Sequence, residues 1–303
     1  MSSAETSRTT PEAAPAPGQT ETAVRKPAPR RSVLAARAAR WRFVALVIVA
    51  LIWLFPLVWI TITALSPAGS VSGGGLPAFS SLSLDTLRAA LDAYPIATWA
   101  LNSTAIAVVA VALTVFVDLL AGYVLAKRRF PGRAVVLLAI IATLMIPVQV
   151  LLIPQFELVA RLGWVNSYWA VIVPRSAEAF GIFLARQYML AIPDELLEAA
   201  ALDGASQWKI FTRVVLPLAR PLIAVLIVMT FMYRWNEFAW PLVALRDPDL
   251  YTLPVGLAFL QGQFATDYPT LMAGALLSML PILVLFVVAQ RYFVAGLARS
   301  GLK

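Results

Sequence analysis

Six long apolar segments alternate with shorter polar ones along the chain. The first, residues 43–65, is 23 residues long and carries no charge. At about 1.5 Å per residue it would extend roughly 34 Å, which is enough to cross the hydrocarbon core of a bilayer. Because a signal-peptide core has only about 7–15 residues, we expect this segment to stay in the membrane. The other five segments are residues 103–126, 134–153, 167–190, 221–245 and 269–290.

Four of these segments contain a residue that interrupts their apolar character. Pro147 predicts a kink in 134–153, and Asn102 is placed to cap the helix over 103–126. The weakest segment is 167–190, which contains Pro174, Arg175 and Glu178. The remaining interruptions are Asp118 in 103–126 and the pair Arg234 and Glu237 in 221–245.

The pattern predicts an all-α polytopic membrane protein with six transmembrane helices over residues 43–303. Residues 1–42 contain no apolar run and are rich in Ala, Pro, Ser, Thr and Arg, so we expect a disordered cytoplasmic tail there. Between the spans, residues 66–98 and 246–268 form the two sizeable loops on the other side, and the first is expected to hold a short helix over 84–92.

Composition agrees with a membrane location and excludes several kinds of chemistry. Hydrophobic residues make up 60% of the chain, charged residues 13%, and the mean hydropathy is +0.80, whereas soluble domains are about 25% charged. The chain has neither cysteine nor histidine. Disulfides and thiolate metal sites are therefore excluded, and no metal site or catalytic residue is predicted. An intramembrane enzyme would also lack its usual general base.

The basic residues indicate the orientation of the spans. On one side of the membrane lie 19 lysines and arginines, and on the other only three, Arg88, Arg161 and Arg246. Because positive residues remain cytoplasmic, both termini are predicted to be inside. The net charge of +8 is thereby explained by topology, so nucleic acid is not an expected partner.

The longest cytoplasmic connection, within residues 191–220, predicts two short helices separated by a glycine. Pro193 suits the first turn of a helix and Gly204 the position just past its end. Residues 193–217, which we call the acidic loop, contain four acids and two bases. A helix lying on lipid headgroups would normally be rich in lysine and arginine. The charge therefore favours a docking surface for a basic protein over a loop on the membrane surface.

The acidic loop resembles the EAA loop of ABC importer permeases. That pattern has Glu-Ala-Ala, three residues, Gly, nine residues, Ile, any residue and Leu-Pro. Here Val214 replaces the isoleucine, a loss of one methylene. The resemblance implies coupling helices that seat in a cytoplasmic ATPase. The implied ATPase-docking residues are Glu198, Ala199, Ala200, Gly204, Leu216 and Pro217.

Further motifs resemble the MalG-like permease subunits of carbohydrate ABC importers, which are binding-protein-dependent inner-membrane components with a MetI-like fold. The resemblance covers about residues 85–303. Its motifs are Ala121-Gly122-Tyr123 with 127–132, Met145-Ile146-Pro147 through Ile153-Pro154, and the run from Trp235 to Leu242.

Charges inside a membrane are costly and so suggest function, although each has a structural alternative. Arg234 and Glu237 are three residues apart on one helix and can neutralise each other. Arg175 and Glu178 form a second such pair, for which a structural role is favoured. Asp118 can hydrogen-bond a neighbouring helix. The candidate residues for a translocation path are Asp118, Arg234, Trp235, Asn236 and Glu237.

The resemblance implies a transport subunit of a sugar or oligosaccharide importer and not an enzyme. Its implied partners are a second, homologous permease, two cytoplasmic ATPases, an extracytoplasmic substrate-binding protein and membrane lipid. This chain has no GxxxxGK[ST] run, so ATP and Mg²⁺ would be bound by the separate ATPases. A glycerol-phosphate permease has nearly the same motifs, and Arg175 and Arg234 keep that alternative open. An ion-coupled secondary transporter is the more distant alternative, since Asp118 is the one acid expected near mid-membrane.

Overall fold

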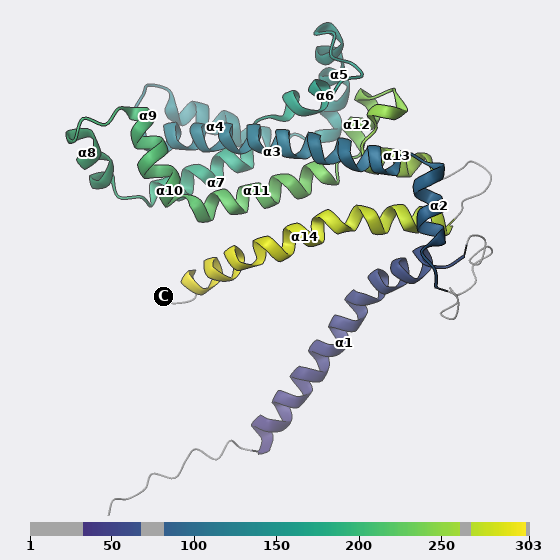
Figure 1. The fold of residues 1–303 in the computed structure, drawn as a ribbon. Coiled ribbons are helices and arrows are strands. Elements are labelled where there is room, and N and C mark those ends of the chain that lie inside the picture. Colours follow the sequence, from purple (N-terminus) through teal and green to yellow (C-terminus); the bar gives the residue numbers. More distant parts are fainter. Residues whose placement is uncertain (1–32, 68–81, 261–267, 301–303) are drawn as a thin grey trace, which may run out of the picture. The chain divides into compact units, whose positions relative to one another are not determined.

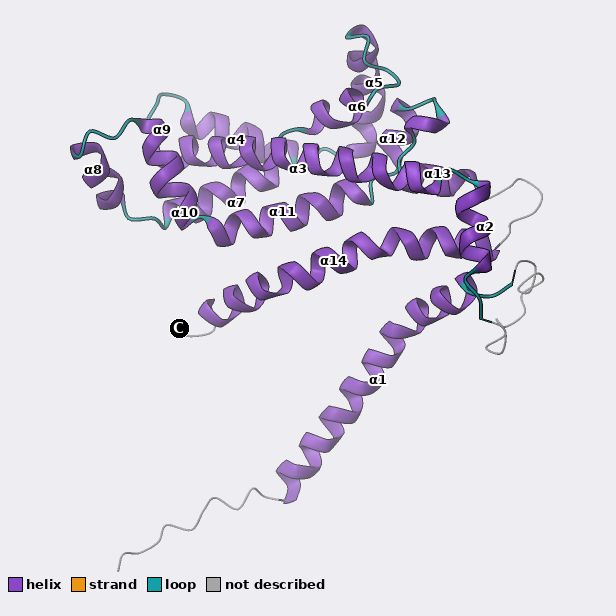
Figure 2. Cartoon of the chain, in the orientation of Figure 1, coloured by secondary structure: helices purple, strands orange, loops and turns teal. Residues whose placement is uncertain are grey.

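The structure is a computed structural model that describes residues 33–67, 82–260 and 268–300. Within these ranges every regular element is helical and no strand occurs (Figure 2). This agrees with the predicted all-α class. Residues 1–32, most of the predicted disordered tail, lie outside the described residues. The chain divides into two units, Met1–Leu54 and Phe55–Lys303.

Helix α1, Val33–Ala64, begins ten residues before the predicted start of the first span. Residues 33–42 are therefore helical, which corrects that part of the predicted tail. From Arg37 to Leu54, every residue of this helix is exposed within its unit. Large apolar side chains such as Phe43, Leu46 and Trp53 are more than 65% exposed. A helix with an exposed apolar surface of this length suits contact with lipid.

The helix around which the second unit is built is α3, Ile96–Lys127. It packs most extensively against α7, Ala179–Leu190, and next against α11, Arg220–Trp235 (Figure 1). Small residues allow the close approach of α3 and α7. A Cβ atom on Gly122 would lie 2.5 Å from Ala185 Cβ, and one on Gly181 would lie 1.9 Å from Asp118 Oδ2. Both contacts pair a residue of α3 with one of α7 at a constant offset, so the two helices run parallel.

Three of the predicted spans are broken rather than continuous. The third consists of α4, Arg133–Thr143, then η1, Val148–Leu151, and α5, Leu152–Arg161, with a bend of 97°. The kink predicted at Pro147 is confirmed. The fifth ends as α11 at Trp235 and resumes as α12, Ala239–Ala244.

The fourth predicted span, 167–190, is not one helix. It comprises α6, Tyr168–Ile172, the 3₁₀ turn η2, Val173–Arg175, and α7, which starts only at Ala179. Pro174 has no N–H to donate, and residues 176–178 form the break.

One helix that precedes α3 and three elements from the last part of the chain pack around the beginning of α3. The elements there are α2, Asp85–Ala93, close to the predicted short helix, η4, Pro248–Leu250, α13, Leu253–Phe259, and α14, Tyr268–Ser300. Asn102 does not cap α3, because the helix begins six residues earlier. Its amide instead donates to the carbonyl oxygens of Asp249 and Tyr251, at 2.7 and 3.0 Å, and so holds the η4 segment.

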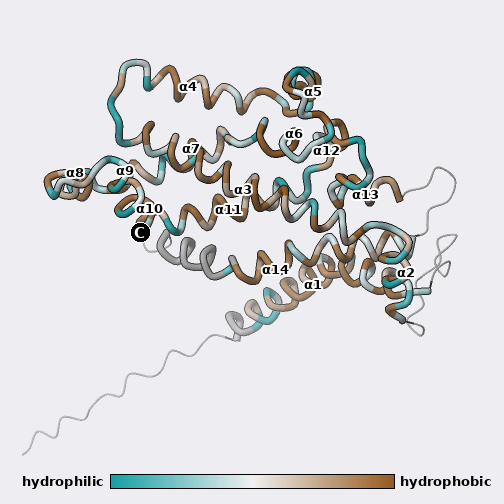
Figure 3. The backbone as a smooth tube through the Cα atoms, turned by 45° about the horizontal axis from the view of Figure 1, so that its top comes forward, coloured by the Kyte–Doolittle hydropathy of each residue, from teal (hydrophilic) through white to brown (hydrophobic). Residues whose placement is uncertain are grey.

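The number of spans is lower than predicted when only continuous helices are counted. Residues 37–64, 96–127 and 268–288 are long and apolar enough to cross a membrane, and two bent pairs raise the total to five. Six continuous transmembrane helices are therefore not confirmed. Apolar residues dominate α3, α4 and α7, whereas the tip that carries α8 is more polar (Figure 3).

We expect Gly122→Val to destabilise the protein because the added side chain would enter the contact with Ala185. Overpacking of this kind costs about 1–3 kcal/mol. The matched control is Ala112→Val on the exposed face of α3. Thermal unfolding of both purified variants in detergent would measure the difference. Equal melting temperatures would show that the packing of α3 against α7 does not depend on their close approach at Gly122.

Candidate functional site

The three breaks, at residues 144–147, 176–178 and 236–238, lie around one open pocket of about 750 Å³. We call it the break pocket. Its walls come from η1 and the start of α5, from the end of η2, and from the α11–α12 junction. The lining residues are Val148, Gln149, Leu152, Arg175, Met229, Met232, Tyr233, Asn236, Glu237, Phe238, Ala239 and Trp240. In transporters, broken helices commonly line the substrate site.

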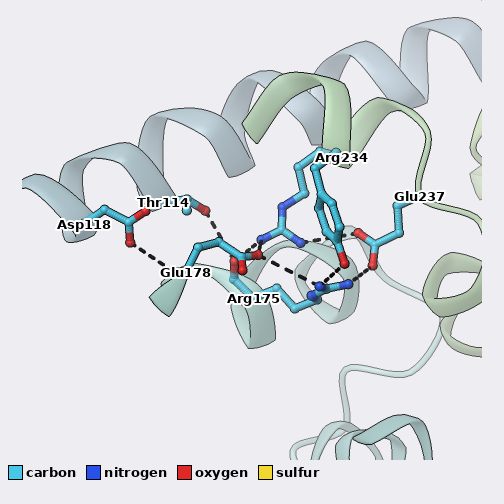
Figure 4. A network of polar contacts seen from close by, with 7 residues as sticks. Thr114, Asp118, Arg175, Glu178, Arg234 and Glu237 are labelled. Atoms are coloured by element: carbon cyan, nitrogen blue, oxygen red, sulfur yellow. Dashed lines mark hydrogen bonds and ion pairs between the residues drawn. The ribbon is translucent and has the colours of Figure 1, made fainter. Parts of the chain in front are cut away.

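Four charged side chains form a network between two of the breaks (Figure 4). Arg234 donates to Glu178, with Nη2 3.0 Å from Oε1, and to Glu237, with Nη1 3.3 Å from Oε2. Arg175 pairs with Glu237 and lies 4.0 Å from Glu178. Each arginine therefore faces both glutamates, and the four charges sum to zero.

The network also supplies partners for the main chain at the 176–178 break. The Arg175 carbonyl oxygen accepts hydrogen bonds from Arg234 Nη2 and from Thr114 Oγ1 of α3. The Glu178 N–H, at the N-cap of α7, donates to Asp118 Oδ1 at 2.9 Å. In a membrane an unpaired peptide group costs several kcal/mol. Side chains of α3 and α11 thus satisfy two of the main-chain groups beside the break.

Tyr233 lies beside the network and faces the break pocket. Its hydroxyl accepts a hydrogen bond from Arg175, whose guanidinium is 4.6 Å from the ring centroid. Tyr233 also lines a second pocket of about 250 Å³, together with Asp118, Glu178 and Thr230. An aromatic side chain that is 45% exposed at such a position can stack on a ring of a bound molecule.

The predicted path residues do not all lie together. Asn236 and Glu237 line the break pocket, and Arg234 lies behind it with a side chain only 1% exposed. Asp118 lines the second pocket. Trp235 faces away from both: it is 1% exposed, stacks on Phe231 and donates from Nε1 to the Ser278 carbonyl of α14. Its placement therefore indicates a structural role.

Several residues of this region were missing from the predicted site. Arg175 and Glu178 were recognised as a pair within one helix, but their shortest contacts cross to Arg234 and Glu237. Their charge inside an apolar segment was the available signal. Gln149, Thr114 and Tyr233 carry no comparable signal, because polar and aromatic residues are ordinary in membrane helices.

The acidic loop forms two short helices, as predicted. The first is α8, Asp194–Leu202, and the second is α9, Gln207–Ile210, followed by a π-helical turn, Phe211–Val215, and α10, Leu216–Leu218. Phe211 and Val215 are buried and anchor the second helix against Tyr123 of α3. Leu216 is half-buried and Pro217 exposed where the chain turns into α11.

Gly204 ends α8 in a left-handed conformation, with φ of 75°. The N–H groups of Gly204 and Ala205 donate to the carbonyls of Ala201 and Ala200, each at 3.0 Å. These two bonds form a Schellman motif. No atom lies within 4 Å of a Cβ built at this position, so glycine is required by its backbone angle and not by space.

The rest of α8 is largely uncovered. Glu198 and Ala199 are exposed and Ala200 is half-buried. Leu202 is 89% exposed and Leu196 46%. The helix therefore presents acidic and apolar side chains together on a surface that the described part of the chain does not bury.

Residues 118–299 match the family model of the binding-protein-dependent transport system inner membrane component. The chain belongs to this family. It is a permease subunit, and the match covers the break pocket, the charge network and the acidic loop. Its family and its apolar helices make it an integral inner-membrane protein.

Individual relatives of this permease transport sugars and related compounds. The arabinooligosaccharides transport system permease protein AraQ of Halalkalibacterium halodurans is 38% identical over 84% of this chain and 93% of its own. The sn-glycerol-3-phosphate transport system permease protein UgpE of Pectobacterium atrosepticum is 40% identical over 66% of this chain and 72% of its own. Among solved structures, a bacterial ABC transporter for the acidic polysaccharide alginate matches with a TM-score of 0.76 and 25% identity, over 88% of this chain and 98% of that one.

Replacing Arg234 should destabilise the permease more than replacing an exposed arginine does. Arg234→Met removes the donor to two glutamates and to the Arg175 carbonyl, and breaking a buried ion pair costs about 3–5 kcal/mol. Arg246→Met, at an exposed arginine, is the control. The measurement is thermal unfolding in detergent. If the two variants unfold at the same temperature, the network does not hold the breaks together.

Proposed function

We propose that this permease belongs to an ATP-driven, binding-protein-dependent importer of sugars or oligosaccharides. AraQ is named for arabinooligosaccharides, and 93% of its length aligns with this chain. In this proposal the permease opens alternately to the two sides of the membrane, and separate ATPases drive the change. The observation that carries the coupling role is α8, a helix bearing the Glu-Ala-Ala motif whose acidic and apolar side chains are left exposed.

The exposed surface of α8 supports protein docking rather than contact with lipid headgroups. Leu196 and Leu202 can enter an apolar cleft, and Glu198 can pair with a basic residue of the ATPase. Ala199 and Ala200 allow close approach, since a methyl group adds little bulk. The Schellman motif at Gly204 fixes the direction in which α9 leaves, and Leu216-Pro217 returns the chain to α11.

The break pocket is the proposed section of the translocation path in this subunit. It combines apolar walls with the polar groups of Gln149, Asn236 and Glu237. Such a lining suits a sugar, which has apolar ring faces and a rim of hydroxyl groups. Asp118 has a mainly structural role in this view, since its carboxylate holds the start of α7.

The proposed complex contains a second, homologous permease, two cytoplasmic ATPases that bind ATP and Mg²⁺, and an extracytoplasmic binding protein. An alginate ABC transporter was solved together with its periplasmic binding protein, and its permease shares this fold. Both termini of our chain would lie in the cytoplasm, on the side of the acidic loop, because the basic residues gather there.

A glycerol-phosphate cargo is the second candidate, because UgpE is also a relative. A phosphate in the break pocket would need an available cation. Arg175 and Arg234 are both paired with glutamates. This pairing favours an uncharged sugar.

Charge reversal at Glu198 should uncouple the transporter. We expect Glu198→Lys to insert normally but to reduce sugar uptake at least about tenfold, equivalent to about 1.4 kcal/mol of lost docking free energy. The control is Glu157→Lys, which changes another exposed acid, on α5. Uptake of labelled sugar by vesicles containing the complete transporter is the measurement. Unchanged uptake would remove the docking role from Glu198.

The purified permease should have no ATPase activity of its own. It lacks the phosphate-binding loop that an ATPase needs. Phosphate release by the subunit alone should equal that of protein-free detergent, and activity should appear when the ATPases are added. Reproducible hydrolysis by the subunit alone would contradict the proposal.

A further inference from the structure

Lys127 connects the last turn of α3 to the beginning of the acidic loop. Its Nζ donates to the Ile192 carbonyl oxygen at 2.5 Å and to Asp194 Oδ1 at 2.6 Å. These two acceptors lie on either side of Pro193, at the start of α8. One ammonium group therefore holds both the turn that leads into α8 and the first residue of that helix.

The position of the Lys127 side chain is unusual for a lysine. It is only 6% exposed, whereas Asp194 is 72% exposed. Lysine is rarely buried unless its charge is paired, because desolvation of the ammonium is costly. The neighbouring Arg133 behaves differently, because it donates within its own connection, to the Arg128 carbonyl. The burial and the two acceptors make Lys127 a specific clamp.

The acidic partner in this clamp, Asp194, is ionised at neutral pH. The hydrogen bond from Lys127 lowers the pKa of the Asp194 carboxyl below its ordinary value of 3.8, and the Lys127 and Arg129 charges act in the same direction. A carboxyl with a lowered pKa contributes stability above its ordinary pKa and loses it as pH falls through the lowered value. The Asp194 carboxylate is therefore present as an acceptor for Lys127 throughout the physiological range.

From Lys127, α3 leads directly to the network at the break pocket. Gly122 of α3 contacts Ala185 of α7 at the close seam, and one turn further Asp118 accepts from the Glu178 N–H. Glu178 belongs to the four-charge network through Arg234. A helix with continuous main-chain bonds transmits a displacement along its axis, so the contacts form an unbroken path from α8 to the break pocket.

We propose that Lys127 is the positioning residue that transfers a displacement of α8 to α3, and through α3 to the break at residues 176–178. This inference rests on the proposed function, in which an ATPase engages the acidic loop. The loop is also covalently continuous with α7 and α11. The role of Lys127 is therefore to make α3 move together with α8, and not to hold the loop in the chain.

The test uses the complete transporter, with both permeases, the ATPases and the binding protein, in lipid vesicles. Because the chain has no cysteine, Ala201→Cys on α8 can report ATPase docking by crosslinking. We expect Lys127→Met to keep the crosslink and ATP hydrolysis but to lower the sugar imported per ATP about five- to tenfold. Arg128→Met, at the next basic residue, is the control and should keep the normal ratio.

Two further variants separate positioning from a general structural role. Lys127→Arg should retain most of the coupling, because it keeps the charge and the donors. The exchanged pair K127D/D194K should recover at least half of the import per ATP that K127D alone loses. Asp194→Asn changes only the exposed partner, so this variant should insert into the membrane even if Lys127→Met does not. It should also lower the sugar imported per ATP.

Each result decides between the proposals. Normal import per ATP in Lys127→Met, or in Asp194→Asn if the former does not insert, would overturn the inference. An equal loss of crosslinking, ATP hydrolysis and sugar uptake would also overturn it, because Lys127 would then be needed for ATPase docking or for folding. Absence of the crosslink in the otherwise unaltered transporter would instead contradict the proposed function itself.

Discussion

A helix that breaks inside a membrane must find partners for its free peptide groups within the protein, since lipid offers none. The break at residues 176–178 has such partners within the protein. Arg234 and Thr114 donate to the Arg175 carbonyl, and Asp118 accepts from the Glu178 N–H. These side chains come from α3 and α11, so the break requires both helices to lie beside α7. The placement of α3 and α11 beside α7 agrees with that requirement.

Charged side chains are tolerated at this largely buried site because they are paired. An isolated charge would be strongly disfavoured. Here two arginines and two glutamates neutralise one another, and each arginine is paired with both glutamates. Each arginine also faces Tyr233, at 4.6 and 5.6 Å from the ring centroid. The resulting group is polar enough to line a path for a hydroxyl-rich molecule, yet it carries no net charge.

Features that depend on local sequence were predictable. Apolar length located the three long continuous helices, Pro147 the bend after α4, and Gly204 the end of α8. Features that depend on pairing between distant segments were not. Three-residue spacing suggested pairs within a helix, whereas the shortest contacts join Arg175 to Glu237 and Arg234 to Glu178. Likewise Asn102 looked like a cap, because the apolar run starts later than the helix, and Trp235 could not be assigned a direction without its partner α14.

The zero net charge of the four-charge network has an evolutionary consequence. A mutation that removes one of its members leaves a net charge beside largely buried arginines, so we expect a lineage that loses one acid to lose a base as well. We therefore expect the four positions to vary in pairs among homologous permeases. Where an apolar or amide side chain replaces one of the acids, another should replace one of the bases.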